Sequence, residues 1–268
     1  MSVCLYALLN DIEYISKKIK EKYMKLYKKL WMSLRKRVFL LLRKRYHVKN
    51  VKGLTYLLDM RNRVDRHIDT FSKYEKPQID FFLSKLKNSN CTVFMDIGSH
   101  WGHYSLLFAN EPCFDQAKIY AFEPDKFNRY QLYANLFLNK MHNRIKVFEC
   151  AISSEEGELR FHHFAENNRG RSCIAEDGEV VVKTARLDTV LPMEGKILGI
   201  KIDVEGHELD VISGMINTLK KNTCVLQIES FPDVLPELKK TMTKLGYSMI
   251  NTISSDHYFS NEKIILKV

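Results

Sequence analysis

Residues 94–105 read Phe-Met-Asp-Ile-Gly-Ser-His-Trp-Gly-His-Tyr-Ser, and this stretch decides the fold. An apolar run ends near Asp96 and passes into a turn of the form D-x-G-x-x-x-G, with its glycines at 98 and 102. Glycines there allow tight backbone turning and close approach of a ligand, and an acid at a strand end can accept hydrogen bonds. The pattern predicts a strand, a glycine turn and a helix. On its own, a purely structural turn explains it equally well.

A second acid stands at a matching place after the next apolar run. The sequence Phe122-Glu-Pro-Asp125 places Glu123 twenty-one residues after Gly102 (123 − 102 = 21). This is close to the offset of ~20 residues at which an acid binds ribose hydroxyls in nucleotide folds. The G-x-G-x-x-G sequence of dinucleotide sites and the G-x-x-x-x-G-K-[ST] sequence of phosphate loops are both absent. The two motifs together predict an adenosyl ligand without phosphates.

Strand-like and helix-like runs alternate around these motifs, which predicts βα units, a mainly parallel sheet and hence an α/β fold. The strand-like runs are residues 93–97, 119–122, 145–152, 197–202 and 224–229, and the helix-like runs are 104–110, 127–138, 209–219 and 235–245. Two-residue alternation predicts an inserted β-hairpin from 158–164 and 179–184. We expect residues 247–250 and 263–268 to end the sheet as an antiparallel hairpin.

The amino-terminal region differs from the rest in charge. Residues 1–52 hold 15 Lys/Arg and three acids (15 − 3 = +12), so the remaining 27 Lys/Arg and 29 Asp/Glu leave residues 53–268 at −2, for a total of +10. Apolar residues recur at helical spacing from about residue 5 to 46, which predicts a basic helical arm over 1–52. Such an arm can cap the main domain, lie on an anionic membrane surface, bind nucleic acid or pack on a partner.

Residues 53–90 are expected to lead into the core. Within them, 54–60 and 64–71 are interpreted as a strand pair, or as a strand and turn, before a helix near 77–86. No apolar run approaches the roughly 20 residues of a membrane span, and the amino terminus lacks the order of a signal peptide. The six scattered cysteines form no C-x-x-C pair. We therefore expect a cytoplasmic protein, peripheral at the inner face of the membrane if the arm binds lipid.

The sequence resembles class I S-adenosylmethionine-dependent methyltransferases, and more narrowly the FkbM family. The resemblance runs from about residue 53 to 268, and its most specific mark is Lys-Ile-Asp-Val-Glu-Gly-His-Glu at 201–208. The other matching segments are residues 94–105, 122–125, 151–153 with Gly157, and 186–190. Ser99 and His100 depart from the family's usual D-x-G-A-N-x-G turn. The resemblance implies a Rossmann-like fold with a seven-stranded sheet, in a methyltransferase domain over 91–268.

The resemblance also implies S-adenosylmethionine as cofactor and assigns its contacts. Asp96, Gly98 and Gly102 would border the methionine part, Glu123 would hold the ribose, and Cys150 and Ala151 would lie beside the adenine. The full predicted cofactor site comprises Asp96, Gly98, Ser99, His100, Trp101, Gly102, Glu123, Pro124, Cys150, Ala151 and Asp203.

Methyl transfer needs a hydroxyl aligned with a sulfonium methyl and a base that removes its proton. Asp203 closes an apolar strand, so we predict it as the base, with Glu205 second. Glu205 can instead belong to the turn alone, and Glu208 can merely favour the next helix's amino terminus. His207 is a candidate substrate residue or an exposed loop residue.

Two further interpretations concern metal and substrate. We predict no resident metal, although Asp203, Glu205 and Glu229 could share a divalent ion. Arg169 and Arg171, at the expected hairpin tip, could bind an anionic or polyhydroxyl substrate or could simply be solvated.

The expected acceptor is a hydroxyl rather than a nucleobase. The fourth strand is followed by Asp-Val-Glu-Gly, not by the D/N-P-P-Y/F that binds an exocyclic amine. The family resemblance implies sugar hydroxyls in glycans, glycolipids or polysaccharide precursors. The alternatives are a nucleic-acid methyltransferase that uses the arm as a clamp and a non-catalytic scaffold that keeps the fold.

Overall fold

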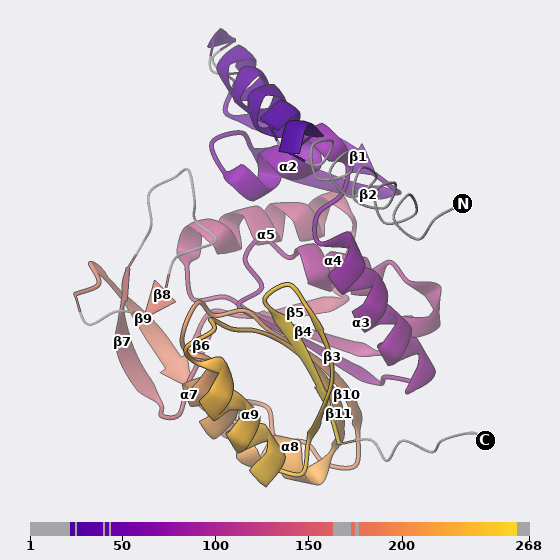
Figure 1. The fold of residues 1–268 in the computed structure, drawn as a ribbon, viewed down its shortest axis with the longest axis vertical. Helices are drawn as coiled ribbons and strands as arrows, with labels where there is room; N and C mark the ends of the chain where they lie inside the picture. Colours follow the sequence, from indigo (N-terminus) through magenta and orange to yellow (C-terminus); the bar gives the residue numbers. More distant parts are fainter. Residues whose placement is uncertain are drawn as a thin grey trace, which may run out of the picture. The chain divides into compact units, whose positions relative to one another are not determined.

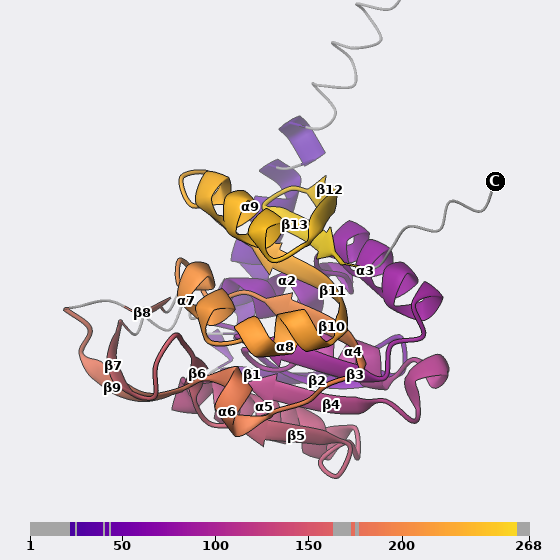
Figure 2. The same cartoon turned by 90° about the horizontal axis from the view of Figure 1, so that it is seen from below.

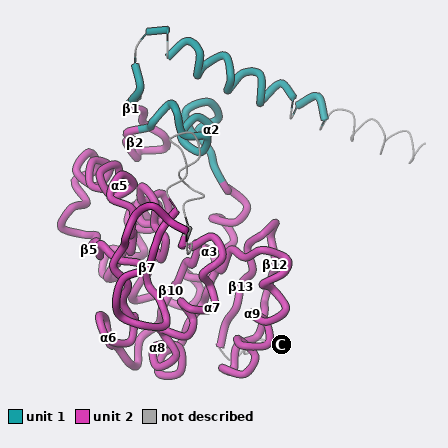
Figure 3. The backbone as a smooth tube through the Cα atoms, turned by 90° about the vertical axis from the view of Figure 1, so that its left-hand side faces the viewer, with its two compact units in different colours: residues 1–47, 58–74 teal, residues 48–57, 75–268 magenta. Residues whose placement is uncertain are grey.

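A computed structural model of the chain describes residues 22–24, 26–39, 41–42, 44–162, 173–174 and 177–261. The chain divides into two compact units, which are described separately below (Figure 3). Unit 1 comprises residues 1–47 and 58–74, and unit 2 comprises residues 48–57 and 75–268. The expected domain boundaries at 52 and 90 stay a prediction.

Unit 2 is built on a seven-stranded sheet with the order β12-β13-β11-β10-β3-β4-β5 (Figure 1). The strands β5, β4, β3, β10 and β11 run parallel, and β13 is antiparallel to both β11 and β12. This is the Rossmann-like α/β fold that the alternating pattern and the resemblance predict. The strands are β3 (Val93–Ile97), β4 (Lys118–Phe122), β5 (Ile145–Phe148), β10 (Ile197–Ile202), β11 (Thr223–Glu229), β12 (Ser248–Ile253) and β13 (Asp256–Ser260).

Helices cover both faces of this sheet, as right-handed βα units require. Helices α3 (Lys76–Asn88), α4 (His103–Ala109) and α5 (Lys126–Leu138) lie on one face, and α7 (Glu208–Ser213), α8 (Ile216–Lys221) and α9 (Leu235–Lys244) lie on the other (Figures 1 and 2). Short helical segments η1 (Pro112–Phe114) and α6 (Leu187–Val190) complete the connections. Alternate residues of β3 serve the two faces: Phe94 stacks on Phe108 of α4, whereas Met95 belongs to the core cluster with Val211 of α7.

The inserted hairpin is confirmed. Strands β7 (Gly157–His162) and β9 (Val180–Ala185) pair antiparallel in a second sheet of order β6-β9-β7-β8, with β6 (Ala151–Ile152) and β8 (Cys173–Ile174). The expected tip with Arg169 and Arg171 lies outside the described residues.

The described part of the sheet ends in an antiparallel hairpin, but the partner of the expected strand at 247–250 is β13 and not the segment 263–268 named from the sequence. The pair is β12 with β13, joined by the turn at 254–255, where Ser254 has a φ of 60°. Residues 262–268, which contain the expected strand, lie outside the described residues. All five residues of β13 are buried. The strand is not evident from the sequence because Asp256, His257 and Ser260 are polar.

Unit 1 contains a long helical stretch and the helix α2 (Arg63–Phe71). We call the first the arm helix; residues 22–24, 26–39 and 41 are helical, and residues 1–21 lie outside the described residues. The expected strand at 64–71 was wrong, because the Asn62 side chain accepts a hydrogen bond from Val64 N and starts a helix there. Strand β2 (Leu54–Asp59) instead pairs with β1 (Tyr46–Val51). No helix among the described residues is long and apolar enough to cross a bilayer.

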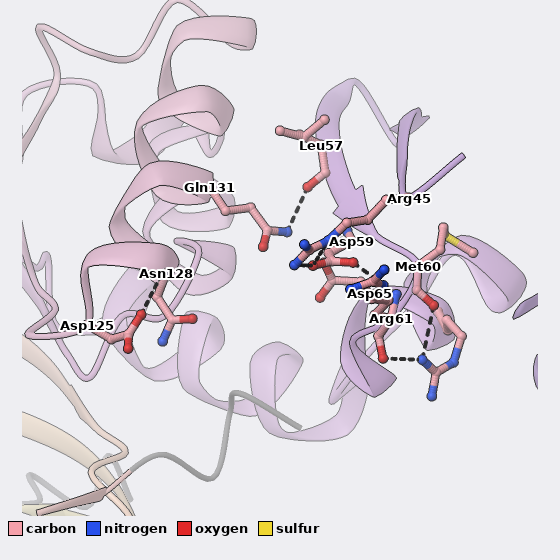
Figure 4. A network of polar contacts seen from close by, with 10 residues as sticks. Arg45, Leu57, Asp59, Met60, Arg61, Asp65, Asp125, Asn128 and Gln131 are labelled. Atoms are coloured by element: carbon pink, nitrogen blue, oxygen red, sulfur yellow. Dashed lines mark hydrogen bonds and ion pairs between the residues drawn. The ribbon is translucent and has the colours of Figure 1, made fainter. Parts of the chain in front are cut away.

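Figure 4 shows polar contacts of Arg45 with Asp59 in unit 1 and, separately, contacts of helix α5 in unit 2. In unit 1, the guanidinium of Arg45 donates to the buried Asp59 carboxylate at 2.9 Å. In unit 2, Asp125 caps α5 by accepting from the backbone N–H of Asn128 at 2.8 Å, and Gln131 donates to the Leu57 carbonyl at 2.8 Å. The second pair ties α5 to the end of β2 that belongs to the same unit.

Candidate active site

The parallel register brings several strand ends into one row at the carboxyl edge of the sheet. Ile97 of β3 pairs with Phe122 of β4 and with Ile202 of β10, so the residues that follow them are neighbours. The same argument extends the row to β5 and β11. In spatial order the row is Glu149, Glu123, Gly98, Asp203 and Glu229. Ligands of open α/β sheets bind at this edge, near the point where the strand order reverses between β3 and β10.

Gly98 is required at the centre of the row. Its φ is +78°, and a Cβ there would lie 1.9 Å from the backbone carbonyl oxygen of Asp203. The Asp203 N–H also donates to the Ile97 carbonyl at 3.0 Å. The glycine therefore lets the end of β3 touch the end of β10, which brings the predicted cofactor turn against the predicted base. Gly102, with φ +87°, begins α4, and a Cβ there would press on the Leu132 side chain at 2.4 Å.

Asp96 lies one step inside the row and is buried. Its Oδ2 accepts hydrogen bonds from the Ser105 N–H at 3.0 Å and from the Ser105 hydroxyl at 2.6 Å, so it anchors the first turn of α4. Burial raises the pKa of Asp96 to about 6, although the Ser105 hydrogen bonds and the Lys201 charge oppose the rise. The Asp96 carboxylate therefore fixes the start of α4, the helix that follows the glycine turn. This position is compatible with its predicted place beside the cofactor.

The Glu123 carboxylate is buried, and backbone N–H groups of the protein already donate hydrogen bonds to both of its oxygens. Its Oε2 accepts from the His100 N–H at 2.7 Å, and its Oε1 accepts from the Asp125 N–H at 2.8 Å. Burial is the main cause that raises the pKa of Glu123 to about 8. The carboxylate thus joins the glycine turn after β3 to the start of α5. The Asn128 side-chain amide also donates to Oε1 at 3.4 Å, whereas Oε2 keeps a second lone pair, so the predicted ribose contact stays open at Oε2.

The remaining turn residues have distinct environments. The Ser99 N–H donates to the Phe122 carbonyl at 3.0 Å, and His100 adopts a left-handed conformation with φ 52°. The Trp101 side chain is only 1% exposed, and its ring lies 5.6 Å from that of Tyr56. Its carbonyl accepts from the Asn135 amide at 3.0 Å. Trp101 has a clear packing role, and its contact with a cofactor stays a prediction.

The other predicted cofactor residues follow the ends of β4 and β5. Pro124 is half-buried, and its carbonyl accepts from the Arg129 guanidinium at 2.5 Å. Cys150 is a free, partly buried thiol whose pKa is raised by burial. Ala151 begins β6 and pairs with Thr184 of β9. These residues frame the side of the row that the resemblance assigns to the adenine.

Sequence reasoning missed Lys201, which lies beneath the predicted base. The Nζ of Lys201 is 3.1 Å from the Asp203 Oδ2, 4.0 Å from the Asp256 Oδ1 and 4.9 Å from the centre of the Tyr104 ring. Burial alone lowers the pKa of Lys201, but the carboxylates of Asp203 and Asp256 outweigh it and raise that pKa. The sequence does contain an indication of this role. Lys201 is the single charged residue in the apolar run 197–202, and a charge in a buried strand needs partners of opposite charge.

A hydrogen-bonded chain continues from this lysine. Gln227 donates to Asp256 at 2.6 Å and to the Tyr104 hydroxyl at 2.9 Å, and that hydroxyl donates to Glu75 at 3.0 Å. Glu229, at the end of β11, accepts from the Ser255 hydroxyl at 2.9 Å. Burial and the nearby Asp203 raise the pKa of Glu229. Asp203 differs from the buried Asp256 in its exposure. It pairs with Lys201, and 31% of its side chain is exposed.

The loop after Asp203 is ordered by its own side chains. Glu205 has a left-handed φ of 52°, and Glu208 is buried and accepts from the Gly206 N–H at 2.8 Å. His207 is not an exposed loop residue: its Nε2 lies 2.9 Å from the Ser153 hydroxyl and its Nδ1 lies 3.3 Å from Asp210. Burial lowers the pKa of His207. His207 therefore fastens the loop to the end of β6, and its predicted substrate contact is untested.

One buried polar group of the glycine turn is available to a ligand, and the expected absence of a resident metal stays a prediction. Within the described ranges, no group of three or more His, Cys, Asp or Glu side chains could hold a metal. The buried Ser99 hydroxyl, in contrast, finds no hydrogen-bond partner among the described residues. A buried donor without a partner is costly, so it suits a site that binds a polar ligand. It lies in the glycine turn next to Gly98, where the cofactor is predicted.

Comparisons with known proteins identify the family of the chain. The model of the methyltransferase FkbM domain matches residues 96–249 (249 − 96 + 1 = 154 of 268 residues). The hexuronic acid methyltransferase AglP of Haloferax volcanii is 27% identical over 157 residues, covering 57% of this chain. The methyltransferase sdnD of Sordaria araneosa is 30% identical over 155 residues, covering 45% of this chain.

The chain spans 60% of the first relative's length and 59% of the second's. Among solved structures, an FkbM methyltransferase from Methylobacillus flagellatus is 15% identical, with a TM-score of 0.45, covering 64% of this chain and 43% of that one. The matched segment 96–249 begins at Asp96 and contains Glu123, Lys201 and Asp203. Since it covers more than half of the sequence, the chain belongs to the FkbM methyltransferase domain family.

Proposed function

We propose that this chain transfers a methyl group from S-adenosylmethionine to a hydroxyl of a sugar in a glycan, glycolipid or polysaccharide precursor. The observation that carries the proposal is the row Glu123, Gly98 and Asp203 at the carboxyl edge of the sheet, in a chain of the FkbM family. The similarity to a hexuronic acid methyltransferase supports a sugar as the acceptor.

The residues that would hold the cofactor are those of the glycine turn and the ends of β4 and β5. Gly98 and Gly102 give the backbone of the turn its shape, and the unpartnered Ser99 hydroxyl offers it a polar contact. Glu123 would accept from the ribose hydroxyls, and Cys150 and Ala151 would line the adenine side. When bound, S-adenosylmethionine supplies an electrophilic methyl carbon on a sulfonium sulfur.

Asp203 is the proposed base. Its carboxylate is partly exposed at the edge where an acceptor can approach, and Lys201 holds one of its oxygens at 3.1 Å. The other oxygen could accept the proton of the sugar hydroxyl, while the bound cofactor would supply the methyl group and leave as S-adenosylhomocysteine. The Lys201 ammonium, fixed between Asp203 and Asp256, orients the Asp203 carboxylate. Glu205 is the second choice.

The test is a methyl-transfer assay with hexuronic acid oligosaccharides and neutral oligosaccharides as acceptors, read as S-adenosylhomocysteine formed and as methyl groups gained by the acceptor. We expect Asp203→Asn to lower kcat by about 10²-fold or more, since positioned proton transfer contributes that much. Glu205→Gln is the matched control and should keep most of the activity. Full activity of Asp203→Asn would exclude Asp203 as the base, and methylation of RNA or DNA in place of sugars would overturn the acceptor class.

A further inference from the structure

The arm helix of unit 1 exposes its apolar residues. Eight large apolar side chains of residues 22–42 are between 51% and 82% exposed; two of them are Met24 and Leu42, and the other six define the exposed stripe: Tyr23, Leu26, Tyr27, Leu30, Leu34 and Leu41. Their spacing follows the helical repeat, so all six lie within about a third of the helix circumference. Contiguous exposed apolar surface of this kind marks an interaction site rather than an ordinary solvated helix.

A different side of the arm helix contacts helix α2 within unit 1. Arg35 Nε is 2.7 Å from the buried Asp69 carboxylate of α2, and Lys28 Nζ lies 5.5 Å from the centre of the Phe71 ring. At about 100° per residue, Lys28 and Arg35 lie more than a third of a turn from the centre of the exposed stripe. The helix therefore holds α2 through basic side chains and turns its apolar side outward. Folding of unit 1 leaves the exposed stripe without a partner in the described residues.

Basic side chains border the exposed stripe. Lys22 and Lys29 are exposed beside one edge of the stripe, Arg37 is exposed within its arc between Leu34 and Leu41, and residues 1–52 carry a net +12. An apolar stripe flanked by Lys and Arg is typical of helices that lie in the plane of a membrane interface, with the apolar side in the acyl boundary and the cations at anionic headgroups. The stripe from residue 23 to 41 would extend about 27 Å along such a surface.

We propose that the exposed stripe of the arm helix binds the surface of a bilayer that contains anionic lipids. The helix lies on the membrane and does not span it, in agreement with the finding that no described helix could cross a bilayer. A nucleic acid would pair with the lysines but would leave the six apolar side chains of the stripe exposed to water. A lipid surface would bind both, and the exposed stripe therefore favours it. This inference is independent of the proposed methyl transfer, and it would bring the enzyme to lipid-linked acceptors.

The test is co-sedimentation of the full chain with vesicles of phosphatidylcholine alone and with equimolar phosphatidylcholine and phosphatidylglycerol. We expect binding to the anionic vesicles and little to the neutral ones. Leu30→Glu should weaken binding by about tenfold, because it removes apolar burial and adds a negative charge. Ser33→Glu is the matched control: it adds the same charge to an exposed position about a quarter turn from the centre of the stripe, and it should weaken binding far less.

Tryptophan fluorescence gives a second measurement. The chain has two tryptophans, of which Trp31, 40% exposed, borders the exposed stripe, and Trp101, 1% exposed, is buried in unit 2. Anionic vesicles should shift the emission to the blue, and Trp31→Phe should abolish the shift. Equal binding of the Leu30→Glu and Ser33→Glu variants, absence of binding to anionic vesicles, or displacement of the vesicles by a duplex oligonucleotide would each overturn the proposal.

Discussion

Gly98 shows how a single missing side chain sets the geometry of the site. Ser99 to Gly102 can turn toward Glu123 only because the backbone at position 98 touches the carbonyl of Asp203. The sequence motif indicated the turn, but not that the glycine faces the strand that carries the predicted base. The two acids of the site, Glu123 and Asp203, are thus held on either side of one residue.

We predict that Gly98→Ala lowers the free energy of unfolding by more than about 3 kcal/mol, since the new Cβ would overlap a backbone oxygen. Gly195→Ala is the matched control, because Gly195 also has a positive φ, of +65°, but nothing lies within 4 Å of the added Cβ. That change should cost about 1 kcal/mol, the strain of the left-handed conformation alone. Urea unfolding measures both, and equal costs would contradict the contact with Asp203.

Glu123 should make stability depend on pH. Its pKa is raised from 4.5 to about 8 by burial, so between these values the folded state binds more protons than the unfolded state. Stability is then fully present below about pH 4.5 and falls as the pH rises through about 8. Asp96, raised from 3.8 to about 6, acts in the same direction at lower pH.

Urea unfolding at pH 5 and pH 8 tests this. We expect wild-type protein to lose at least about 1 kcal/mol between them, and Glu123→Gln, which cannot ionise, to lose clearly less. Glu149→Gln, at the exposed end of the same row, should keep the wild-type dependence. An unchanged pH dependence in Glu123→Gln would show that Glu123 is not the group responsible.

Lys201 should be necessary for the fold as well as for the site. Lys201→Met leaves the Asp203 and Asp256 carboxylates facing each other without their cation, and we expect a loss of about 3–5 kcal/mol in the free energy of unfolding. Lys196→Met, at an exposed position just before β10, should change stability by less than about 0.5 kcal/mol. Comparable losses in both variants would mean that the buried pairing contributes little.

At the scale of elements, strong periodicity predicted most of unit 2. The βα alternation from β3 to α9 and the inserted hairpin could both be predicted, because each follows from a local repeat in the sequence, whereas the strand β13 was not predicted. Helix α2 could not, because the capping hydrogen bond of Asn62 overrides a run that looks extended. The network around Lys201 could not either, since Tyr104, Gln227 and Asp256 meet only after the sheet forms.

Helix α5 positions the glycine turn through one side chain. The buried Asn135 accepts from the Leu57 N–H at 2.7 Å and donates to the Trp101 carbonyl at 3.0 Å. We predict that Asn135→Ala costs about 2–3 kcal/mol, because it leaves a buried donor and a buried acceptor without partners. Amide hydrogen exchange should be faster at Leu57 in this variant.

Asn139→Ala is the matched control for that change. Asn139 is half-buried one turn later and bonds Thr55 in the same way, accepting from its N–H at 2.8 Å. It should cost less and speed exchange at Thr55 while the protection of Leu57 stays as in wild type. Unchanged protection of Leu57 in Asn135→Ala would contradict the link between α5 and β2.

For the whole molecule, the sequence divides into a slightly acidic catalytic body and a strongly basic arm, and each has its own proposed ligand. Unit 2 carries the row of strand ends that defines the candidate active site, and unit 1 carries the exposed stripe. Family membership rests on residues 96–249, all of which belong to unit 2. Loss of membrane binding and loss of methyl transfer are therefore separable by substitutions in different units.

The central claim is that the row at the carboxyl edge binds S-adenosylmethionine, and calorimetric titration of the full chain with this cofactor and with S-adenosylhomocysteine tests it most directly. We predict micromolar binding, about −8 kcal/mol, that Glu123→Gln weakens by at least about tenfold, or 1.4 kcal/mol, while Glu149→Gln leaves it unchanged. A folded chain that binds neither compound, or that binds them equally well without the Glu123 carboxylate, would contradict the account.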